Sequence, residues 1–410
     1  MSYQNKHSKS EAITERDETP VLGEYDVIVL GGGIAGVSAA LAAKRNGAST
    51  LIVEKSIMLG GLATIGFVNK YLPLCDGNGI KVCGGICEEL LYLSIKYGYN
   101  TLSEEWAGGK LKKGTNKRYM SVFSPYDFVL ALDEKIQEEG IDILFDTIFC
   151  KPSMQGGKCE AIIVENKSGR AAYKAKYFVD ATGDADLMYR AGVDCGIQKN
   201  WLTYWGYVTS VEKMEKGTGK SSVMQGVPLW ELGSMADGTG GSVNDKYDGT
   251  DAKEITSFVL NGRKIMREKI KTADDTEITT VALPHMPQVR TTRHIIGATN
   301  ITEKDLNQYI GESIGCAPDW RRNKEVYEVP FGALYNPAAE NIITAGRCIA
   351  AGDDSWEVTR AIPACSVTGE AAGTACAIAL KEEVAFEGIE IKKLQEMLTE
   401  QGAILHYKNK

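Results

Sequence analysis

EYDVIVLGGGIAGVSAALAAKRNGASTLIVEK, residues 24–55, is the stretch of this sequence that decides the fold. Its apolar run Val27–Leu30 predicts a short buried strand. The alanine-rich segment Val37–Lys44 consists of strong helix formers and ends near Gly47, a residue that favours helix termination. A second β-rich run, Thr50–Val53, closes the stretch. The order strand, helix, strand predicts a βαβ unit, the building block of a parallel sheet.

Three glycines occupy the turn between the first strand and the helix in G-x-G-x-x-G spacing. Gly31 permits a tight turn, Gly33 lets the backbone approach a pyrophosphate, and Gly36 lets helix and strand pack closely. The free N–H groups and the positive dipole end of the helix favour phosphates there. Glu54, 18 residues after Gly36, can accept hydrogen bonds from ribose hydroxyls. The unit predicts dinucleotide binding, with FAD and NAD both open; the alternative is a glycine-rich turn in an ordinary α/β domain.

The composition sets limits on size, charge and setting. The chain has 410 residues, 43% of them hydrophobic, which is enough to bury a substantial core in two domains. Its net charge of −8 argues against a nucleic-acid partner. No apolar run reaches the roughly 18 residues of a membrane span, and residues 1–20 form a polar, flexible tail. We therefore expect a cytoplasmic protein without a nucleic-acid or membrane partner, whose ten scattered cysteines are reduced thiols.

Further strands and helices are predicted after this unit. The segment from Pro125 has the pattern of a helix with Ser124 as N-cap, followed by a strand that ends near Thr147–Cys150. Strand-like runs at 158–166 and 171–180, separated by a turn, predict a small antiparallel meander.

Three other stretches bring small residues to turns. Met58–Asn69, MLGGLATIGFVN, could bring its backbone close to a ligand or be a plain connecting loop. Tyr177–Leu187, YFVDATGDADL, is a strand that runs into a small-residue turn. Glu340–Leu380 holds a strand, a Gly-Arg turn and a helix that opens near Pro363. That helix is rich in alanine and glycine, so it can approach a flat ligand or a strand closely.

Together these stretches resemble the FAD-dependent oxidoreductase family within the glutathione-reductase-like, Rossmann-type flavoprotein superfamily. The family's D-A-T-G-D-A-D pattern is present at Asp180–Asp186. Its later A-G-R…R-x-x-P-x-C-x-x-T-G-x-A-A-G pattern is present at Ala345–Gly373. The resemblance covers roughly residues 21–385, with a poor match at about 210–280. The joint match is specific, whereas any one piece alone is not.

The resemblance implies an α/β fold: a Rossmann-like FAD-binding domain with a parallel sheet plus an antiparallel meander, and a mixed α+β substrate domain. Inside the substrate domain, residues 232–254 are rich in Gly, Ser and Asp and predict a long mobile loop, either an active-site lid or an insertion. The expected boundaries are a flexible tail at 1–20, a discontinuous FAD-binding domain at 21–190 and 336–385, the substrate domain at 191–335, and a C-terminal helix and tail at 386–410.

The resemblance also implies FAD as the cofactor. The glycine turn would meet the pyrophosphate, Glu54 the adenosine ribose, and the backbone of Ile148 the adenine. The late helix would begin beside the flavin pyrimidine ring, where its positive end stabilises the negative charge of reduced flavin. Arg347 could contact the ribityl chain or phosphate, or be a surface ion-pair residue. The expected cofactor-binding residues are Gly31, Gly33, Ile34, Ala35, Gly36, Glu54, Lys55, Gly60, Gly61, Ala63, Thr64, Ile148, Ala181, Thr182, Gly183, Asp184, Gly346, Arg347, Ala364, Cys365, Thr368 and Gly369.

Candidate catalytic residues lie in the segment PHMPQVRTTRHIIGATN, which resembles an R-x-x-R-x-I-x-G segment of the family. Arg290 and Arg293 would bind an anionic substrate or the flavin; they share one face of a helix but diverge on a strand. His294 could donate or accept a proton near neutral pH, or be a hydrogen-bonded structural histidine.

The cysteines give little support for a metal site. Cys75, Cys83 and Cys87 have a spacing that matches no standard ligand pattern, so we expect no metal. Cys365 would sit at a helix N-terminus, where a thiolate is favoured, so a redox role is open beside the favoured reading of small-residue packing.

These observations predict an FAD-dependent oxidoreductase that transfers a hydride between flavin and a polar, anionic or hydroxylated small molecule. The sequence holds one G-x-G-x-x-G unit that follows a strand, so electrons would come from or pass to a separate electron-transfer protein, oxygen or a second substrate. The alternatives are an FAD-assisted hydratase, isomerase or lyase, and an FAD-binding subunit of an electron-transfer complex. A homo-oligomer is possible on either reading.

Overall fold

The computed structural model describes most of the chain: residues 13–16, 18–109, 117–219, 223–234, 246–274 and 277–407. Most of the predicted tail at 1–20 and residues 235–245 of the predicted loop at 232–254 lie outside these residues. The described ends of that predicted loop are partly regular structure, since a strand covers Lys246–Tyr247 and a helix begins at Ala252. Each helix in the described ranges is too short or too polar to cross a lipid bilayer.

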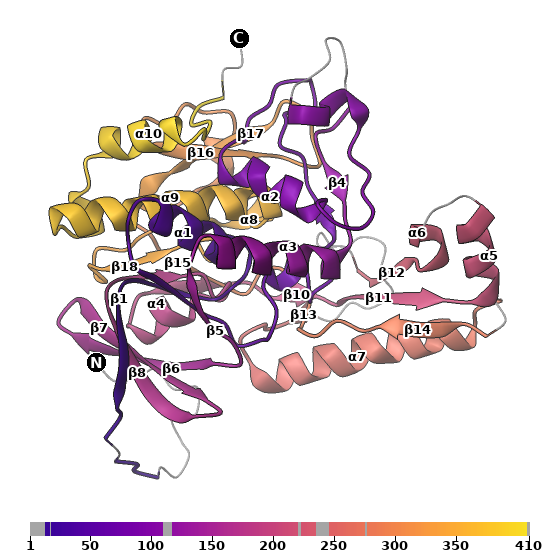
Figure 1. Cartoon of the computed structure of the whole chain (residues 1–410), viewed down its shortest axis with the longest axis horizontal. Helices are drawn as coiled ribbons and strands as arrows, with labels where there is room; N and C mark the ends of the chain where they lie inside the picture. The colour runs from indigo at the N-terminus through magenta and orange to yellow at the C-terminus, as the bar shows by residue number, and fades with distance from the viewer. Residues whose placement is uncertain are drawn as a thin grey trace.

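A mostly parallel sheet forms the centre of the fold (Figure 1). Its strands lie in the order β5 (Asp142–Leu144), β2 (Thr50–Val53), β1 (Val21–Leu30) and β8 (Gly169–Asp180), and β18 (Ile342–Thr344) pairs with the end of β8. All of these pairs are parallel. The last four residues of β1 and all of β2 are buried, as expected for strands covered on both faces. The predicted Rossmann-like parallel sheet is confirmed.

An antiparallel meander extends this sheet through β6 (Ile148–Gln155), β7 (Lys158–Asn166) and β8, which confirms the predicted meander. The predicted strand that ends near Thr147–Cys150 is wrong. Strand β5 ends at Leu144, and the chain turns at Asp146, whose φ is 47°, before β6 begins. Strand β6 is half-exposed and contains a proline, which an edge strand tolerates, so no alternating apolar pattern marks it in the sequence.

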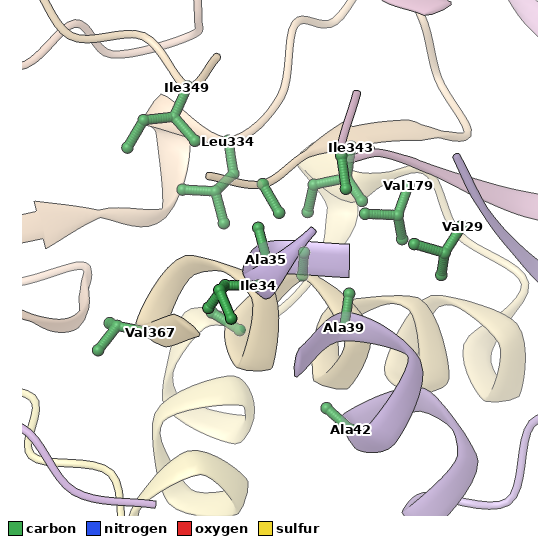
Figure 2. Close-up of a cluster of buried hydrophobic side chains, with 14 of the residues drawn as sticks. Val29, Ile34, Ala35, Ala39, Ala42, Val179, Leu334, Ile343, Ile349 and Val367 are labelled. Atoms are coloured by element: carbon green, nitrogen blue, oxygen red, sulfur yellow. The ribbon is translucent and has the colours of Figure 1, made fainter. Parts of the chain in front are cut away.

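Two long helices, α1 (Ile34–Arg45) and α9 (Ile362–Glu382), pack against each other and against the sheet (Figure 2). Their backbones approach closely because α9 presents glycines. A Cβ on Gly369 or Gly373 would lie 2.1–2.2 Å from a carbonyl oxygen of α1. Helix α1 begins earlier than predicted, but it ends as predicted before Gly47, which has a φ of 96°.

Other helices and short strand pairs complete this part of the molecule. The helices are α2 (Ile86–Ser94), α3 (Pro125–Glu138), α4 (Asp186–Arg190), α8 (Asp353–Thr359) and α10 (Ile391–Glu400). The strand pairs are β3 (Lys70–Tyr71) with β4 (Ser121–Val122), β9 (Cys195–Ile197) with β15 (Arg293–Ile295), and β16 (Ser313–Pro318) with β17 (Val326–Pro330). Helix α3 begins directly after Ser124, as predicted, although the Ser124 side chain makes no capping hydrogen bond.

A smaller antiparallel sheet lies to the right in Figure 1, with a long helix packed on it. The elements of this region are β12 (Leu229–Gly233), β11 (Thr203–Thr209), β14 (Thr279–Ala282), α7 (Ala252–Lys271), α5 (Val211–Gly219), α6 (Val223–Gly226) and the pair β10 (Asn200–Trp201) with β13 (Lys246–Tyr247). Its buried apolar side chains form small clusters within residues 202–289. Ile295 and the buried apolar residues after it join the main core instead. The residues with a separate core therefore span a shorter part of the chain than the predicted substrate domain at 191–335.

A buried acid on α9 makes the stability of this fold depend on pH. The Glu370 side chain is 2% exposed; its Oε2 accepts a hydrogen bond of 3.0 Å from the Ile86 N–H at the start of α2. Burial raises the pKa of Glu370 to about 8 from 4.5, with the nearby Glu89 carboxylate adding to the effect. The folded state therefore holds this proton more tightly than the unfolded state, so stability falls as pH rises from about 4.5 to about 8.

We expect Glu370→Gln to remove this part of the pH dependence, because the amide cannot ionise. For one proton the slope is roughly 1.4 kcal/mol per pH unit within that window. The measurement is the free energy of unfolding of both proteins between pH 5 and pH 9. The two curves should converge at low pH and separate at high pH, with the variant more stable. Parallel curves would mean that Glu370 ionises without cost.

Candidate functional site

Two glycines make the turn between β1 and α1 tight. Gly31 has a φ of 100°, in the left-handed region, and a Cβ there would lie 2.4 Å from the carbonyl oxygen of Ala181. A Cβ on Gly36 would lie 1.8 Å from the carbonyl oxygen of Gly31. The protein's own packing therefore requires glycine at both positions, and neither position identifies a ligand.

Gly33 differs, because a Cβ at this position would meet no protein atom within 4 Å. It is the N-cap of α1, and no side chain in the described part of the chain caps the first N–H groups of that helix. The loop with Gly60 and Gly61 bounds the open space at Gly33 on one side. Gly60 forms a β-bridge with Gly33, and a Cβ on Gly61 would lie 3.2 Å from the Cα of Gly33. Ala63 and Thr64 follow in the same loop and are buried. This cradle of free donors and open space fits a pyrophosphate.

Glu54 lies at the end of β2, beside the glycine turn. Its Oε2 accepts a hydrogen bond of 2.6 Å from the Gly32 N–H, and its Oε1 accepts one of 2.7 Å from the Ser56 N–H. Each carboxylate oxygen can accept a further bond, so a ribose contact stays a prediction. Lys55, next to it, is exposed. The Ile148 side chain is 59% exposed at the start of β6, and its backbone contact with adenine also stays a prediction.

The N-terminus of α9 meets the N-terminus of α1 at Gly346. Its φ is 85°, and a Cβ there would lie 2.8 Å from the Ala35 Cβ and 3.7 Å from the Cys365 Sγ. Thr368 Oγ1 accepts a hydrogen bond of 2.9 Å from the Gly346 N–H. Ala364 is buried beside these residues. The positive ends of two helices thus face the same turn, which favours negative charge there.

The turn after β8 is held by a buried acid. Asp180 Oδ1 accepts a hydrogen bond of 2.7 Å from the Thr182 hydroxyl, and Oδ2 accepts one of 2.9 Å from the Met188 N–H. Burial raises the pKa of Asp180 to about 6. Asp180 therefore shapes the turn that brings Ala181 against the glycine turn.

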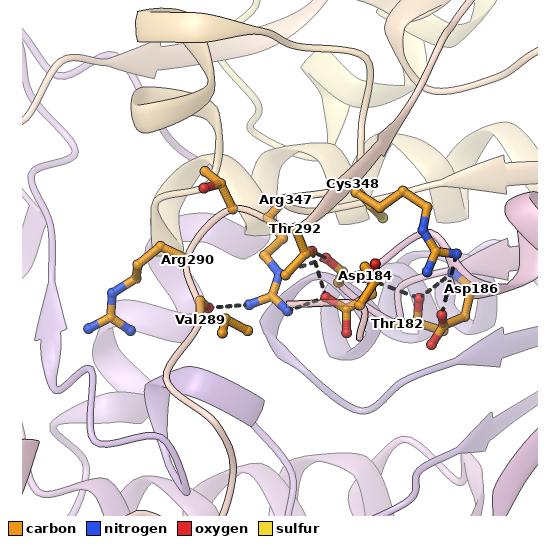
Figure 3. A network of polar contacts seen from close by, with 12 residues as sticks. Thr182, Asp184, Asp186, Val289, Arg290, Thr292, Arg347 and Cys348 are labelled. Atoms are coloured by element: carbon orange, nitrogen blue, oxygen red, sulfur yellow. Dashed lines mark hydrogen bonds and ion pairs between the residues drawn. The ribbon is translucent and has the colours of Figure 1, made fainter. Parts of the chain in front are cut away.

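Arg347 is a buried crosslink between loops (Figure 3). Its Nε donates to the Gly183 carbonyl at 2.6 Å, its Nη1 to the Val289 carbonyl at 2.8 Å, and its Nη2 to Asp184 Oδ1 at 2.7 Å. Burial raises the pKa of Asp184, but the Arg347 and Lys55 charges outweigh this and hold that pKa below its usual value. Arg347 is thus an ion-pair residue, as the alternative reading held, but the pair with Asp184 is largely buried and not at the surface. Three donors of Arg347 are taken by the protein, so a cofactor contact would have to use the remaining N–H groups.

The segment Gln288–Thr292 forms hydrogen bonds both with the part of the molecule around the large sheet and with the region of the smaller sheet. Its first residue, Gln288, donates a hydrogen bond of 2.6 Å to the Gly66 carbonyl, in the loop that follows the Gly60-Gly61 pair. Asn200 Oδ1 accepts from two N–H groups in the middle of the segment, at 2.6 and 2.8 Å. The last residue donates a hydrogen bond of 2.6 Å to Asp184. The backbone that carries Arg290 is therefore firmly positioned.

The Arg290 side chain, in contrast, makes no hydrogen bond or ion pair with the described residues. Its guanidinium lies 4.9 Å from the Trp205 ring centre, and its Nη1 is closed to solvent without a partner among those residues. Figure 3 shows it reaching away from the Arg347 network. Desolvation, together with the charges of Arg360 and Arg347, lowers the pKa of Arg290 to about 9. A cation that remains charged at neutral pH thus faces a place that favours an anion.

The side chains of Arg293 and His294 do not lie in the same site as that of Arg290. They are neighbours on β15, so their side chains point to opposite faces. The Arg293 guanidinium stacks 3.9 Å from the Tyr189 ring centre and lies 3.7 Å from Asp186 Oδ1. The His294 ring packs edge-on against Trp356 at 4.6 Å, and burial lowers its pKa. The structure does not bring these two side chains onto one ligand, and their catalytic roles stay predictions.

Arg360, Trp205 and Asn200, which lie near Arg290, were not among the predicted site residues. Arg360 belongs to the R-x-x-P pattern quoted above, so a signal for it was present. Trp205 and Asn200 had no such signal, because they are brought to Arg290 by hydrogen bonds to the segment Gln288–Thr292, which is far away along the chain.

All ten cysteines are free thiols. Burial raises the pKa of Cys365 to about 12, against the lowering effect of nearby arginines, so packing describes this thiol better than a reactive thiolate. Cys75, Cys83 and Cys87 are buried in the core, and the Cys83 thiol donates to the Cys316 carbonyl at 3.2 Å. Within the described residues, no group of three or more His, Cys, Asp or Glu side chains could hold a metal ion.

Comparison with known proteins gives matches along most of the chain. A model of the family described as FAD dependent oxidoreductase matches residues 26–224 and 243–398. Thioredoxin reductase of Ureaplasma parvum serovar 3 is 34% identical over 89 residues, which cover 22% of this chain and 29% of that protein. NADH:fumarate oxidoreductase of Klebsiella pneumoniae is 27% identical over 252 residues, which cover 52% of this chain and 26% of that protein. The chain therefore spans less than a third of the length of these curated relatives.

A solved structure shares the fold. p-Nitrophenol 4-monooxygenase PnpA of Pseudomonas putida DLL-E4 superposes with a TM-score of 0.52 at 12% identity. The superposition covers 92% of this chain and 85% of that one. At this identity the likeness concerns the fold alone.

Proposed function

Because the chain belongs to the family of FAD-dependent oxidoreductases, we propose that it transfers a hydride between FAD and a small anionic or hydroxylated molecule that binds beside Arg290. FAD is the cofactor, and the open cradle at Gly33 fits its pyrophosphate. When bound, FAD supplies the two-electron centre that accepts a hydride from the substrate or gives one to it.

One observation carries the choice of an anionic substrate, namely the Arg290 guanidinium without a protein partner. A buried cation costs stability unless an anion compensates it. The backbone around Arg290 is held by Asn200 and Gln288, so the side chain can orient a substrate with little loss of entropy. Residues 191–335 are proposed as the substrate-facing domain, since they supply Arg290, Trp205 and Asn200.

The other residues of the site would position the Arg290 side chain and shield it from water. Trp205 covers the Arg290 guanidinium and keeps water from that side. Arg347 holds the Val289 carbonyl next to Arg290 and keeps the neighbouring turn in place. An FAD-assisted reaction without net redox change is the less favoured alternative, because the family is described by its oxidoreductase activity. We propose further that electrons pass to or from a separate protein, oxygen or a second substrate.

Anaerobic reduction of the flavin tests this function. The holoenzyme would be mixed without oxygen with small hydroxy acids, amino acids and neutral alcohols, and bleaching of the flavin absorbance would be followed by stopped flow. We expect saturable bleaching by an anionic substrate and much slower bleaching by NADH, because the sequence has one dinucleotide-binding unit. After photoreduction, a matching oxidised compound should restore the absorbance. Turnover of a compound without any change of the flavin would contradict the proposal and favour non-redox chemistry.

A further inference from the structure

A second guanidinium lies beside Arg290. Arg360 ends helix α8, directly before the N-cap of α9, and its positive charge is close enough to lower the pKa of Arg290. Its Nη2 forms an ion pair with Glu357, while its Nε is closed to solvent and has no partner in the described part of the chain. Two arginine donors without protein partners therefore lie in the same neighbourhood.

A small cavity opens at this place. Its volume is about 30 Å³, and its walls include Arg290, Thr291, Asn200, Thr203 and Glu357. A water molecule occupies roughly 10–15 Å³ on this measure, so the cavity has room for about two or three water-sized groups. That is the size of a carboxylate, whereas a phosphate, with four oxygens around phosphorus, is larger.

Two of the polar wall side chains already have hydrogen-bond partners. The Asn200 amide donates to the Thr291 carbonyl, and the Thr203 hydroxyl donates a bond of 2.9 Å to the Ser234 carbonyl. Of the lining groups that form no hydrogen bond with the described residues, the Arg290 guanidinium is planar, which matches the planar geometry of a carboxylate.

The charges around the cavity favour a ligand with few negative charges. Lys70 lies 2.7 Å from Glu231, and Lys199 lies 3.4 Å from Glu254. Arg347 is neutralised by Asp184, and Arg360 by Glu357. Lys246 is exposed and stacks 4.6 Å from the Trp201 ring centre at the edge of the cavity. Arg290 and Lys246 are thus lining cations without an ion pair to a carboxylate of the described residues, Arg290 partly buried and Lys246 exposed, and Glu357 repels a ligand of high negative charge.

We propose that this cavity, with Arg290 as its donor and the charge of Arg360 nearby, is a carboxylate subsite that binds the carboxylate group of the substrate. The proposal rests on the proposed function, because it assigns a chemical class to the substrate of the same site. Arg290, which lines the cavity, would donate from its guanidinium to the carboxylate. Arg360 does not line the cavity and would act through its positive charge, held nearby by the ion pair with the lining residue Glu357. Glu357 acts as a positioning residue that holds Arg360 and selects against phosphate.

If Arg290 serves only to bind a ligand, its replacement should change the melting temperature in a characteristic direction. Because the charge of Arg290 is partly buried without a partner among the described residues, replacement by an apolar side chain of similar length should raise the melting temperature of the ligand-free protein. A carboxylate that fills the subsite should raise the melting temperature of the wild type and leave that of the variant unchanged. A structural arginine would show the opposite: its removal would lower the melting temperature.

The experiment uses the FAD-loaded protein with acetate, benzoate and inorganic phosphate as probes at equal ionic strength. Binding is measured from the change in the flavin absorbance spectrum, from calorimetry and from the melting temperature. We expect benzoate and acetate to bind, and phosphate to bind at least tenfold more weakly. Arg290→Met should weaken carboxylate binding at least tenfold, since it removes a charge-assisted contact, and Arg360→Gln should act in the same direction. Arg322→Met, which removes an exposed arginine paired with Glu325, is the matched control and should bind the probes like the wild type.

Equal binding of benzoate by the wild type and Arg290→Met would overturn the subsite, as would phosphate binding as tight as benzoate binding. If Arg290→Met does not fold, Arg290→Lys keeps the charge but loses the planar fork, and unchanged carboxylate selectivity in that variant would also overturn it. Different results would contradict the redox function and the carboxylate subsite. Carboxylates that bind while no compound reduces the flavin would contradict the redox function, and a neutral alcohol that reduces the flavin without carboxylate binding would contradict the subsite.

Discussion

Gly33→Val is expected to abolish FAD binding while the fold remains intact. A Cβ at Gly33 meets no protein atom within 4 Å, so the valine side chain would fill the space left for the pyrophosphate. The backbone there has a φ of −67° and a ψ of 178°, an extended conformation that valine adopts readily. We expect FAD to bind at least about a hundredfold more weakly, because both shape and phosphate contacts are lost. Flavin content per chain and FAD titration of the apoprotein measure the effect.

Two matched glycine variants sharpen this test. Gly311→Val also adds a side chain where a Cβ would meet no atom within 4 Å, but at an exposed position away from the glycine turn, so it should keep full flavin content. Gly36→Ala should unfold the domain instead, because its Cβ would lie 1.8 Å from the Gly31 carbonyl oxygen. Normal flavin content in Gly33→Val would mean that the phosphates bind elsewhere. Loss of the circular dichroism signal in that variant would mean that Gly33 is needed for folding rather than for FAD.

Arg347→Met should destabilise the protein by about 3–5 kcal/mol, because it leaves the Asp184 carboxylate buried without its guanidinium. The change also removes donors from the Gly183 and Val289 carbonyls, which lie on either side of the site. Denaturant unfolding monitored by circular dichroism measures the loss. FAD content should fall as a consequence, since the turn that carries Gly183 loses its support.

The control is Arg170→Met, which removes an exposed arginine paired with Glu165 and should change stability by no more than about 1 kcal/mol. Adding Asp184→Asn to Arg347→Met should restore part of the lost stability, because the unpaired buried charge disappears. An Arg347→Met protein of normal stability but without FAD would show that Arg347 serves the cofactor directly and that the crosslink is dispensable.

Local patterns in the sequence determined the FAD-binding unit. The strand, glycine turn, helix, strand and Glu54 all depend on residues close in the chain, and their periodicity and turn chemistry are readable there. The meander at 158–180 and the start of α9 near Pro363 follow for the same reason. Family resemblance added FAD itself, which the residues alone left open beside NAD.

Only the tertiary structure decided which side chains have partners. Arg290, Arg293 and Arg347 are alike in the sequence. In the structure, Arg347 forms an ion pair with Asp184 and Arg293 lies near Asp186, whereas Arg290 lines a cavity. Their partners and neighbours come from the turn after β8, from α4 and from the region of the smaller sheet, which lie far away along the chain, and no local pattern encodes such contacts. Gly33 and Gly36 differ in the same way. Both belong to one motif, yet only the packed structure shows that a side chain at Gly36 would strike the protein and one at Gly33 would enter empty space.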